Sequence, residues 1–179
     1  MAKAIIQDNF FSNFNNIKDS FKKIPLYDLK TYNKNISTKP ENWPGKRSAN
    51  IFKINPFLFN LIIKEMYEKF GQILPPNIIM SSFVHLRLSE DEGKDWIHTD
   101  KTCGDWSLLV YLSKTNLNSG TCLYEKENEK PSTTVNFVQN RAFLFDSNIL
   151  HKSLHNHGDN IENGRLTLNC FIRNGKTEI

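Results

Sequence analysis

His98 and Asp100 have the residue types and the spacing of a metal-binding pair. Residues i and i+2 of a strand point to the same face, so this imidazole and this carboxylate can reach one ion. A third ligand must come from elsewhere in the chain, and the candidates are His151, His155 and His157. Two histidines and one carboxylate, which leave three coordination positions open, are the ligand set of non-haem Fe(II) oxygenases. A closed structural zinc site would instead need cysteines or a further histidine at close spacing.

The metal-binding pair lies in a region of short β-type segments, residues 78–173. Turn-forming Gly, Asn, Asp, Ser and Pro residues separate these segments. Eight short strands at regular spacing are typical of a sandwich or barrel, and eight is the strand number of a jelly roll. The predicted strands are residues 78–88, 95–98, 105–113, 120–125, 133–138, 141–146, 149–155 and 165–173.

Residues 1–77 form a second region, in which helical segments alternate with loops. Asn55 is a good N-cap, Pro56 suits the first helical position and Gly71 ends the apolar repeat, so we expect a helix over residues 55–70. We expect a second helix over 14–24 and a loop over 38–45. The apolar stripe of the long helix comprises Phe57, Leu61, Ile62, Met66 and Phe70. We therefore predict one domain over 1–179, mainly β with N-terminal helices (α+β), in which residues 1–77 support a β core of residues 78–173.

The composition is that of an ordinary globular protein, with 39% hydrophobic and 23% charged residues among 179. No apolar stretch approaches the roughly 20 residues that cross a bilayer, and the first residues lack a secretory signal. Three cysteines without close pairing argue against disulfides, so we expect a cytoplasmic protein with no membrane partner. Residues 1–50 hold nine Lys and Arg against four Asp and Glu. That excess is too dispersed for a nucleic-acid footprint, so no nucleic-acid partner is expected.

Taken in order, these features resemble the 2-oxoglutarate/Fe(II)-dependent dioxygenases, on their prolyl 4-hydroxylase-like branch. The resemblance covers about residues 78–173 and implies a double-stranded β-helix, the jelly roll that the strand count also predicts. The segments that carry it are His98-x-Asp100, residues 106–113, 119–121 and 145–151, and Arg165-x-Thr167.

The resemblance implies a role for each matched residue. The catalytic residues, which would hold Fe(II), are His98, Asp100 and His151. Arg165 would pair with the distal carboxylate of the cosubstrate 2-oxoglutarate, because a guanidinium binds a carboxylate through two parallel hydrogen bonds. The residues that would complete the cosubstrate pocket are Tyr111, as a hydrogen-bond donor, and Thr167 and Asn169, which share the face of Arg165.

Several of these assignments have alternatives. The spacing to Arg165 in the family fits His155 as the last metal ligand, whereas the segment from Phe145 to His151 fits the family's Phe-x(5)-His pattern. We favour His151, with residues 156–164 as an inserted loop. Tyr111 could equally be a core aromatic, and Thr167 and Asn169 could be ordinary polar strand residues. On the first predicted strand, His85 and Arg87 face either the substrate cleft or solvent.

The resemblance implies an oxygenase that uses Fe(II), 2-oxoglutarate and O2, with ascorbate as a possible support. We expect it to hydroxylate an amino-acid, peptidyl (prolyl-type) or small-metabolite substrate and to convert 2-oxoglutarate to succinate. Because Asp100 is present, the resemblance implies hydroxylation or demethylation rather than halogenation, since the halogenating relatives lack this carboxylate. Two alternatives are a non-catalytic, cupin-like jelly-roll binding module and a nucleic-acid demethylase of the same superfamily.

Overall fold

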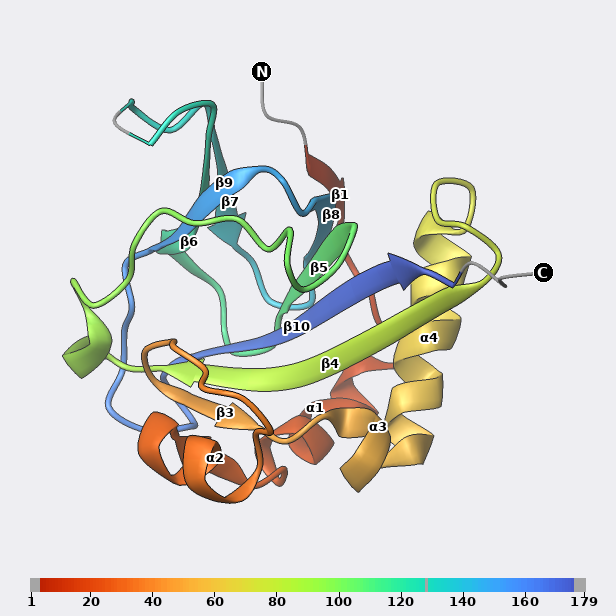
Figure 1. Ribbon diagram of the computed structural model, residues 1–179, viewed down its shortest axis with the longest axis horizontal. Helices are drawn as coiled ribbons and strands as arrows, with labels where there is room; N and C mark the ends of the chain where they lie inside the picture. Colours follow the sequence, from red (N-terminus) through yellow and green to blue (C-terminus); the bar gives the residue numbers. More distant parts are fainter. Residues whose placement is uncertain (1–3, 128, 176–179) are drawn as a thin grey trace.

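The computed structural model describes residues 4–127 and 129–175, which form two antiparallel sheets with helices beside them (Figure 1). The larger sheet has seven strands, in the order β1 (Ala4–Gln7), β8 (Ala142–Asp146), β5 (Trp106–Tyr111), β10 (Arg165–Asn174), β4 (Ile78–Arg87), β3 (Lys46–Ser48) and β2 (Leu26–Asp28). The smaller sheet has three strands, in the order β7 (Thr133–Phe137), β6 (Asn116–Tyr124) and β9 (Leu150–Leu154). This arrangement is a jelly roll, as the sequence predicted.

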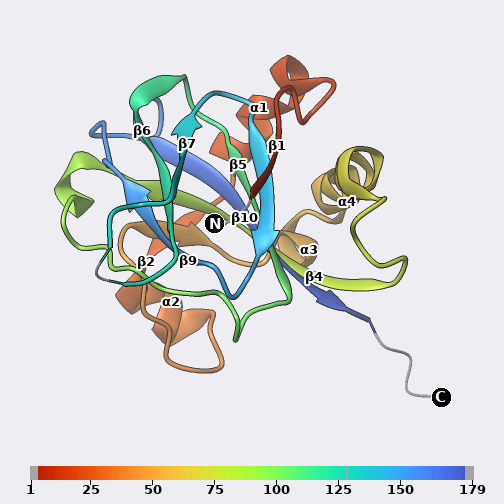
Figure 2. The ribbon, with the colours of Figure 1, turned by 90° about the horizontal axis from the view of Figure 1, so that it is seen from above.

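The helices are α1 (Phe14–Lys22), α2 (Leu29–Asn35), α3 (Ile51–Ile54) and α4 (Pro56–Phe70), followed by the 3₁₀ turn η1 (Ser89–Asp91). Figure 2 shows α3 and α4 on one side of the larger sheet and the smaller sheet on the other. The side chain of Asn55 caps α4 by accepting a hydrogen bond of 3.0 Å from the backbone N–H of Leu58. Across the described residues, no helix is both long enough and apolar enough to traverse a bilayer.

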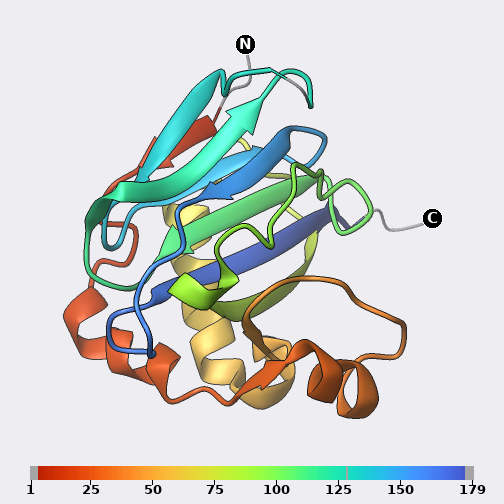
Figure 3. The ribbon, with the colours of Figure 1, turned by 90° about the vertical axis from the view of Figure 1, so that its left-hand side faces the viewer.

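The larger sheet has two chemically different faces, because side chains alternate along each strand. One face is apolar and packs against α1 and α4 in the main core. On β10 its residues are Leu166, Leu168, Cys170 and Ile172, all at most 1% exposed. The other face carries Arg165, Thr167 and Asn169 on β10 and is turned toward the smaller sheet (Figure 3). A cavity with charged side chains in its lining lies between the two sheets.

Three features differ from the sequence-based expectations. Residues 95–98 form no strand, because His98 exchanges backbone hydrogen bonds with His151 alone, as an isolated bridge. Residues 1–77 contribute three strands in addition to helices: β1 and β2 form the two edges of the larger sheet, and β3 lies between β2 and β4. These strands have three or four residues each, too few to produce a recognisable alternation. Phe57, placed in the apolar stripe of the long helix, is 82% exposed.

Candidate active site

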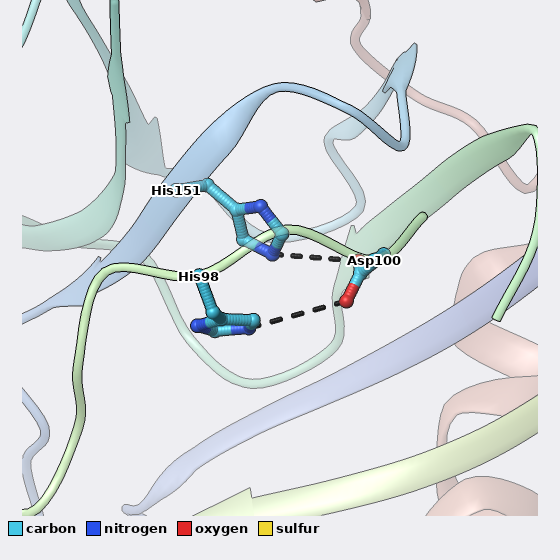
Figure 4. Close-up of side chains that lie close together, drawn as sticks. All are labelled: His98, Asp100 and His151. Carbon is cyan, nitrogen blue, oxygen red and sulfur yellow. Dashed lines mark ion pairs between the residues drawn. The ribbon is translucent and has the colours of Figure 1, made fainter. Parts of the chain in front are cut away.

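Three side chains that could hold a metal ion point toward one another (Figure 4), and all three line the cavity. His151 is the second residue of β9, and the backbone bridge to His98 holds the two histidines side by side. Asp100 lies two residues further on, with its oxygens 3.9 Å from Nε2 of His98 and 3.4 Å from Nε2 of His151. One ligand atom from each residue lies within 4.8 Å of the other two. The cluster thus converges on one point, as a metal ion requires.

Both histidines are oriented through their Nδ1 atoms. Nδ1 of His98 lies 2.9 Å from the carbonyl oxygen of Trp96, and Nδ1 of His151 lies 3.0 Å from that of Ile149. A carbonyl can only accept, so Nδ1 carries the hydrogen and Nε2 offers a lone pair toward Asp100. Burial lowers the pKa of His151, and the neighbouring His98 acts in the same direction although Asp100 opposes it. His151 therefore presents the neutral imidazole that binds metal.

The carboxylate of Asp100 is also fixed in place. Oγ of Ser107 donates a hydrogen bond of 2.8 Å to Oδ2 of Asp100, and the same hydroxyl lies 2.9 Å from Oγ of Ser147. The backbone N–H of Asp100 donates to the carbonyl of Ser147 at 2.9 Å. Supporting hydrogen bonds of this kind orient metal ligands in proteins. Two nitrogen donors and one carboxylate on one side of a point, with the other side open, fit Fe(II).

Arg165 reaches into the same cavity from the start of β10. The residue is 3% exposed, and Nη2 of its guanidinium donates to the carbonyl of Gly120 at 3.0 Å and to Oγ1 of Thr121 at 3.2 Å. Burial lowers the pKa of Arg165 to about 10, so it stays charged at neutral pH. Its buried Nε has no hydrogen-bond partner, and no carboxylate of the described residues forms an ion pair with it. An anionic ligand would satisfy this buried cation.

The cavity has a volume of about 290 Å³, and its lining combines apolar side chains with charged ones, among them three arginines. The side chains that line it include the three potential metal ligands together with Arg165, Asn169, Arg47, Arg87, His85 and Asp95. Ligand pockets of proteins commonly start at about 300 Å³, so the cavity suits small molecules.

No protein-family model matches the sequence, and no curated protein matches it. Solved structures do match over nearly the whole chain. One is an oxidoreductase of the 2OG-Fe(II) oxygenase family from Burkholderia pseudomallei, 9% identical, with a TM-score of 0.63 over 94% of this chain and 84% of that one. A second is the non-haem, α-ketoglutarate-dependent epimerase SnoN of nogalamycin biosynthesis, 10% identical, with a TM-score of 0.63 over 97% and 78%.

A third is the viral collagen prolyl hydroxylase of Paramecium bursaria Chlorella virus-1, in a truncated form. It is 14% identical and has a TM-score of 0.55 over 97% of this chain and 90% of that one. The chain has the fold of the 2-oxoglutarate/Fe(II)-dependent oxygenases. At these low identities the match establishes the oxygenase fold, while the activity must be argued from the side chains.

Within the oxygenase fold, the other residues expected in the cosubstrate pocket lie at different depths. Asn169 lines the cavity, and its Oδ1 accepts a hydrogen bond of 2.8 Å from the fully buried Thr167. The hydroxyl of Tyr111 is fully buried, 3.0 Å from Oγ1 of Thr121 and 2.9 Å from the carbonyl of Val135. The Tyr111 ring centre lies 5.8 Å from the guanidinium carbon of Arg165. The structure thus places Tyr111 and Thr167 behind the residues that line the oxygenase cavity.

The alternative third ligands lie away from the cluster. His155 has a positive φ of 47°, and its side chain, 63% exposed, contacts Oε1 of Glu92 at 3.2 Å. The ring of His157 packs edge-on against Phe137 at 5.5 Å. Of the three candidates, the structure brings His151 to His98 and Asp100.

Two buried charged residues of the cavity were not identified from the sequence. Asp95 forms an ion pair of 2.6 Å with Arg87, and it accepts hydrogen bonds from the backbone and the hydroxyl of Ser153. Arg47 lies on β3, in the region expected to hold helices and loops.

His85 and Arg87 line the cavity, and His85 Nε2–H donates to the carbonyl of Pro44 at 2.7 Å. Burial, reinforced by Arg87 and Arg47, lowers the pKa of His85 far below its usual value, so it is neutral.

Proposed function

We propose that the chain is an Fe(II)- and 2-oxoglutarate-dependent oxygenase that acts on a small-molecule, amino-acid or peptidyl substrate. One observation carries the proposal: a two-histidine, one-carboxylate cluster and a buried arginine without an acidic partner line one cavity of an oxygenase fold. A jelly roll that used its histidines only for packing would have no need of either feature.

The residues divide the work. His98, Asp100 and His151 would hold Fe(II), which, when bound with 2-oxoglutarate and O2, supplies the oxidation of the substrate coupled to formation of succinate and CO2. Arg165 would pair with the distal carboxylate of 2-oxoglutarate and so orient its 2-oxo acid end toward the metal-binding cluster. Asn169 would add a hydrogen-bonding group on the same wall, with Thr167 fixing its amide. Tyr111 would position Arg165 by packing beneath it.

Charge balance supports this division. Two neutral imidazoles and one carboxylate would leave a divalent ion with a net charge of +1. With Arg165 the site then carries +2, which the dianion 2-oxoglutarate neutralises. A near-neutral total matters because uncompensated charge is costly in a buried site.

The test uses anaerobic protein with Fe(II) and 2-oxoglutarate. We expect a weak visible absorption band, which is lost in His98→Ala and in Asp100→Ala, and retained in the matched control His155→Ala. In air, succinate should form with the wild-type protein and the control and fall below detection in the two ligand variants. Binding of ligands without any succinate would favour a cupin-like binding module and reject the oxygenase.

The type of product needs a separate measurement, because SnoN shares the fold and is an epimerase. We propose hydroxylation, which adds one oxygen atom to the substrate. Mass spectrometry of a substrate pool incubated with Fe(II), 2-oxoglutarate and ascorbate should reveal a product heavier by one oxygen. A consumed substrate that reappears at unchanged mass would contradict hydroxylation while leaving 2-oxoglutarate dependence intact.

A further inference from the structure

Arg47 is a buried cation whose surroundings are aromatic. It lies on β3 opposite His85 of β4, and the residue is only 9% exposed. Its guanidinium carbon lies 4.1 Å from the ring centre of Phe83, 5.5 Å from that of Phe171 and 5.7 Å from that of Trp43. Aromatic rings stabilise a cation, but each contributes only about 0.5–2 kcal/mol.

Arg47 differs from Arg87, which lines the same cavity. Arg87 donates 2.6 and 2.7 Å hydrogen bonds to Asp95 and Ser153. Arg47, in the part of the chain that the structure describes, forms neither a hydrogen bond through its side chain nor an ion pair, and its Nε is buried without a partner. Glu41 lines the cavity as well but does not pair with it. A buried charge without an anion is unfavourable, so this guanidinium is poised to receive one.

The position of Arg47 indicates where that anion would come from. A second cavity of about 370 Å³ adjoins the metal-binding cavity, and Arg47 lines both. The residues common to the two linings are Glu41, Arg47, Thr102, Cys103 and Phe171. The rest of the second lining includes the rings of Tyr32 and Phe83 and two more cations, Lys39 and Arg173. Arg47 thus stands at the junction between the metal-binding cluster and a basic, partly aromatic chamber.

We propose that Arg47 binds a carboxylate of the primary substrate, so that the substrate is an organic acid with an apolar body. This inference rests on the proposed function, in which Arg165 takes the distal carboxylate of 2-oxoglutarate. The cavity then has two buried cations without acidic partners, Arg47 and Arg165, and receives two anionic molecules. The single charge of Arg47 matches one carboxylate, and Phe83 and Phe171 offer an apolar wall to the rest of the molecule.

The test compares acids with their own amides. The probes are arylalkanoic acids and N-acetyl amino acids, each paired with its primary amide, which keeps the shape and removes the charge. Binding is measured by equilibrium dialysis against the full chain loaded anaerobically with Fe(II) and 2-oxoglutarate. At least one acid should bind the wild-type protein about tenfold or more tightly than its amide.

Three variants assign that preference. Arg47→Met, which removes the charge and keeps an unbranched side chain, should abolish it, and Arg47→Lys should retain only part of it. Lys46→Met removes a charge from the neighbouring exposed residue and should leave the preference for the acid over its amide unchanged. The proposal is overturned if no acid is preferred to its amide by the wild-type protein, or if the preference survives in Arg47→Met. If Arg47→Met does not fold, Arg47→Lys, which keeps the charge, serves in its place. An acid preference in Arg47→Lys equal to that of the wild-type protein would then overturn the proposal.

Binding of 2-oxoglutarate, measured on the same samples, separates this proposal from the proposed function. The cosubstrate should bind Arg47→Met as well as the wild-type protein, and it should be lost in Arg165→Met. A wild-type protein that fails to bind 2-oxoglutarate contradicts the oxygenase. A wild-type protein that binds 2-oxoglutarate without preferring any acid contradicts only the role of Arg47. Loss of the cosubstrate in Arg47→Met would make Arg47 its anchor and also overturn the proposal.

Discussion

The two faces of the larger sheet are built from the same strands, but one face forms the apolar core and the other lines the cavity. On β10, Leu166 and Leu168 are at most 1% exposed within the apolar core, while Arg165 between the sheets is equally buried at 3%. Burial of Leu168 stabilises the fold, whereas burial of Arg165 costs free energy that a ligand would recover. Degree of burial therefore does not distinguish core from site in this molecule. What distinguishes them is whether the buried group already has its partner.

The metal-binding side of this comparison predicts the largest effect. Asp100→Ala should lower succinate formation by more than about 100-fold, because loss of even a group that supports a ligand typically costs 10- to 100-fold. The midpoint of thermal unfolding of the metal-free protein should hardly change, since Asp100 is partly exposed and outside both apolar clusters. Activity and differential scanning calorimetry on one preparation measure both. A large loss of stability would mean that Asp100 belongs to the structural face.

The apolar face predicts the opposite pattern. Leu168→Ala removes a fully buried side chain and should lower the free energy of unfolding by about 3 kcal/mol, within the usual range of 2–5. Thr167→Ala, one residue earlier on the site face, should lower it by only about 1 kcal/mol through loss of the hydrogen bond to Asn169. Urea unfolding at neutral pH measures both. Equal losses would show that the faces do not differ in the way described.

The ion pair of Arg87 and Asp95 lines the cavity but stabilises the fold, and its contribution to the free energy of unfolding should depend on pH. Burial alone would raise the pKa of Asp95, but the charge of Arg87 and the hydrogen bonds from Ser153 hold it well below its usual value. Because the folded pKa is depressed, the stability that Asp95 contributes is present above its unfolded pKa of about 3.9 and is lost as pH falls below it.

Asp95→Asn should therefore lower the free energy of unfolding by about 3 kcal/mol at pH 7, since it leaves Arg87 buried beside a neutral group. The difference from wild type should shrink as the pH falls below 4. Urea unfolding across that range, with the exposed Asp159→Asn as control, tests this. A pH-independent difference would show that lost hydrogen bonds, and not the charge of Asp95, are responsible.

The sequence predicted the parts of the molecule where one strong pattern spans many residues. The oxygenase fold and seven of the eight expected core strands are confirmed. His151 and Arg165 were found because one ends the Phe-x(5)-His pattern and the other opens the last predicted strand, while His98 and Asp100 were found from their spacing. The structure brings all four to one cavity. Their roles in binding Fe(II) and 2-oxoglutarate remain predictions.

The sequence did not predict features that depend on distant partners. Arg47 belongs to a strand of three residues, which carries no periodicity, and its burial results from packing against Phe83 and Phe171. Asp95 stands in a charged, Gly-containing loop and gains its significance from Ser153, which lies 58 residues away in the chain. Local sequence contains neither relation, because tertiary packing creates both.

Of these substitutions, Ser107→Ala is expected to have the smallest effect. It tests whether a buried residue beside Asp100 supports metal binding or the stability of the fold. Ser107 is 3% exposed, and its hydroxyl donates to Asp100 while it contacts Ser147. Ser107→Ala should weaken Fe(II) binding by about tenfold and leave the free energy of unfolding within about 1 kcal/mol of wild type, because it frees Asp100 without opening a cavity. The metal concentration that gives half-maximal succinate formation measures the first quantity and urea unfolding the second. Weaker stability with unchanged metal binding would place Ser107 on the structural side, despite its position between the sheets.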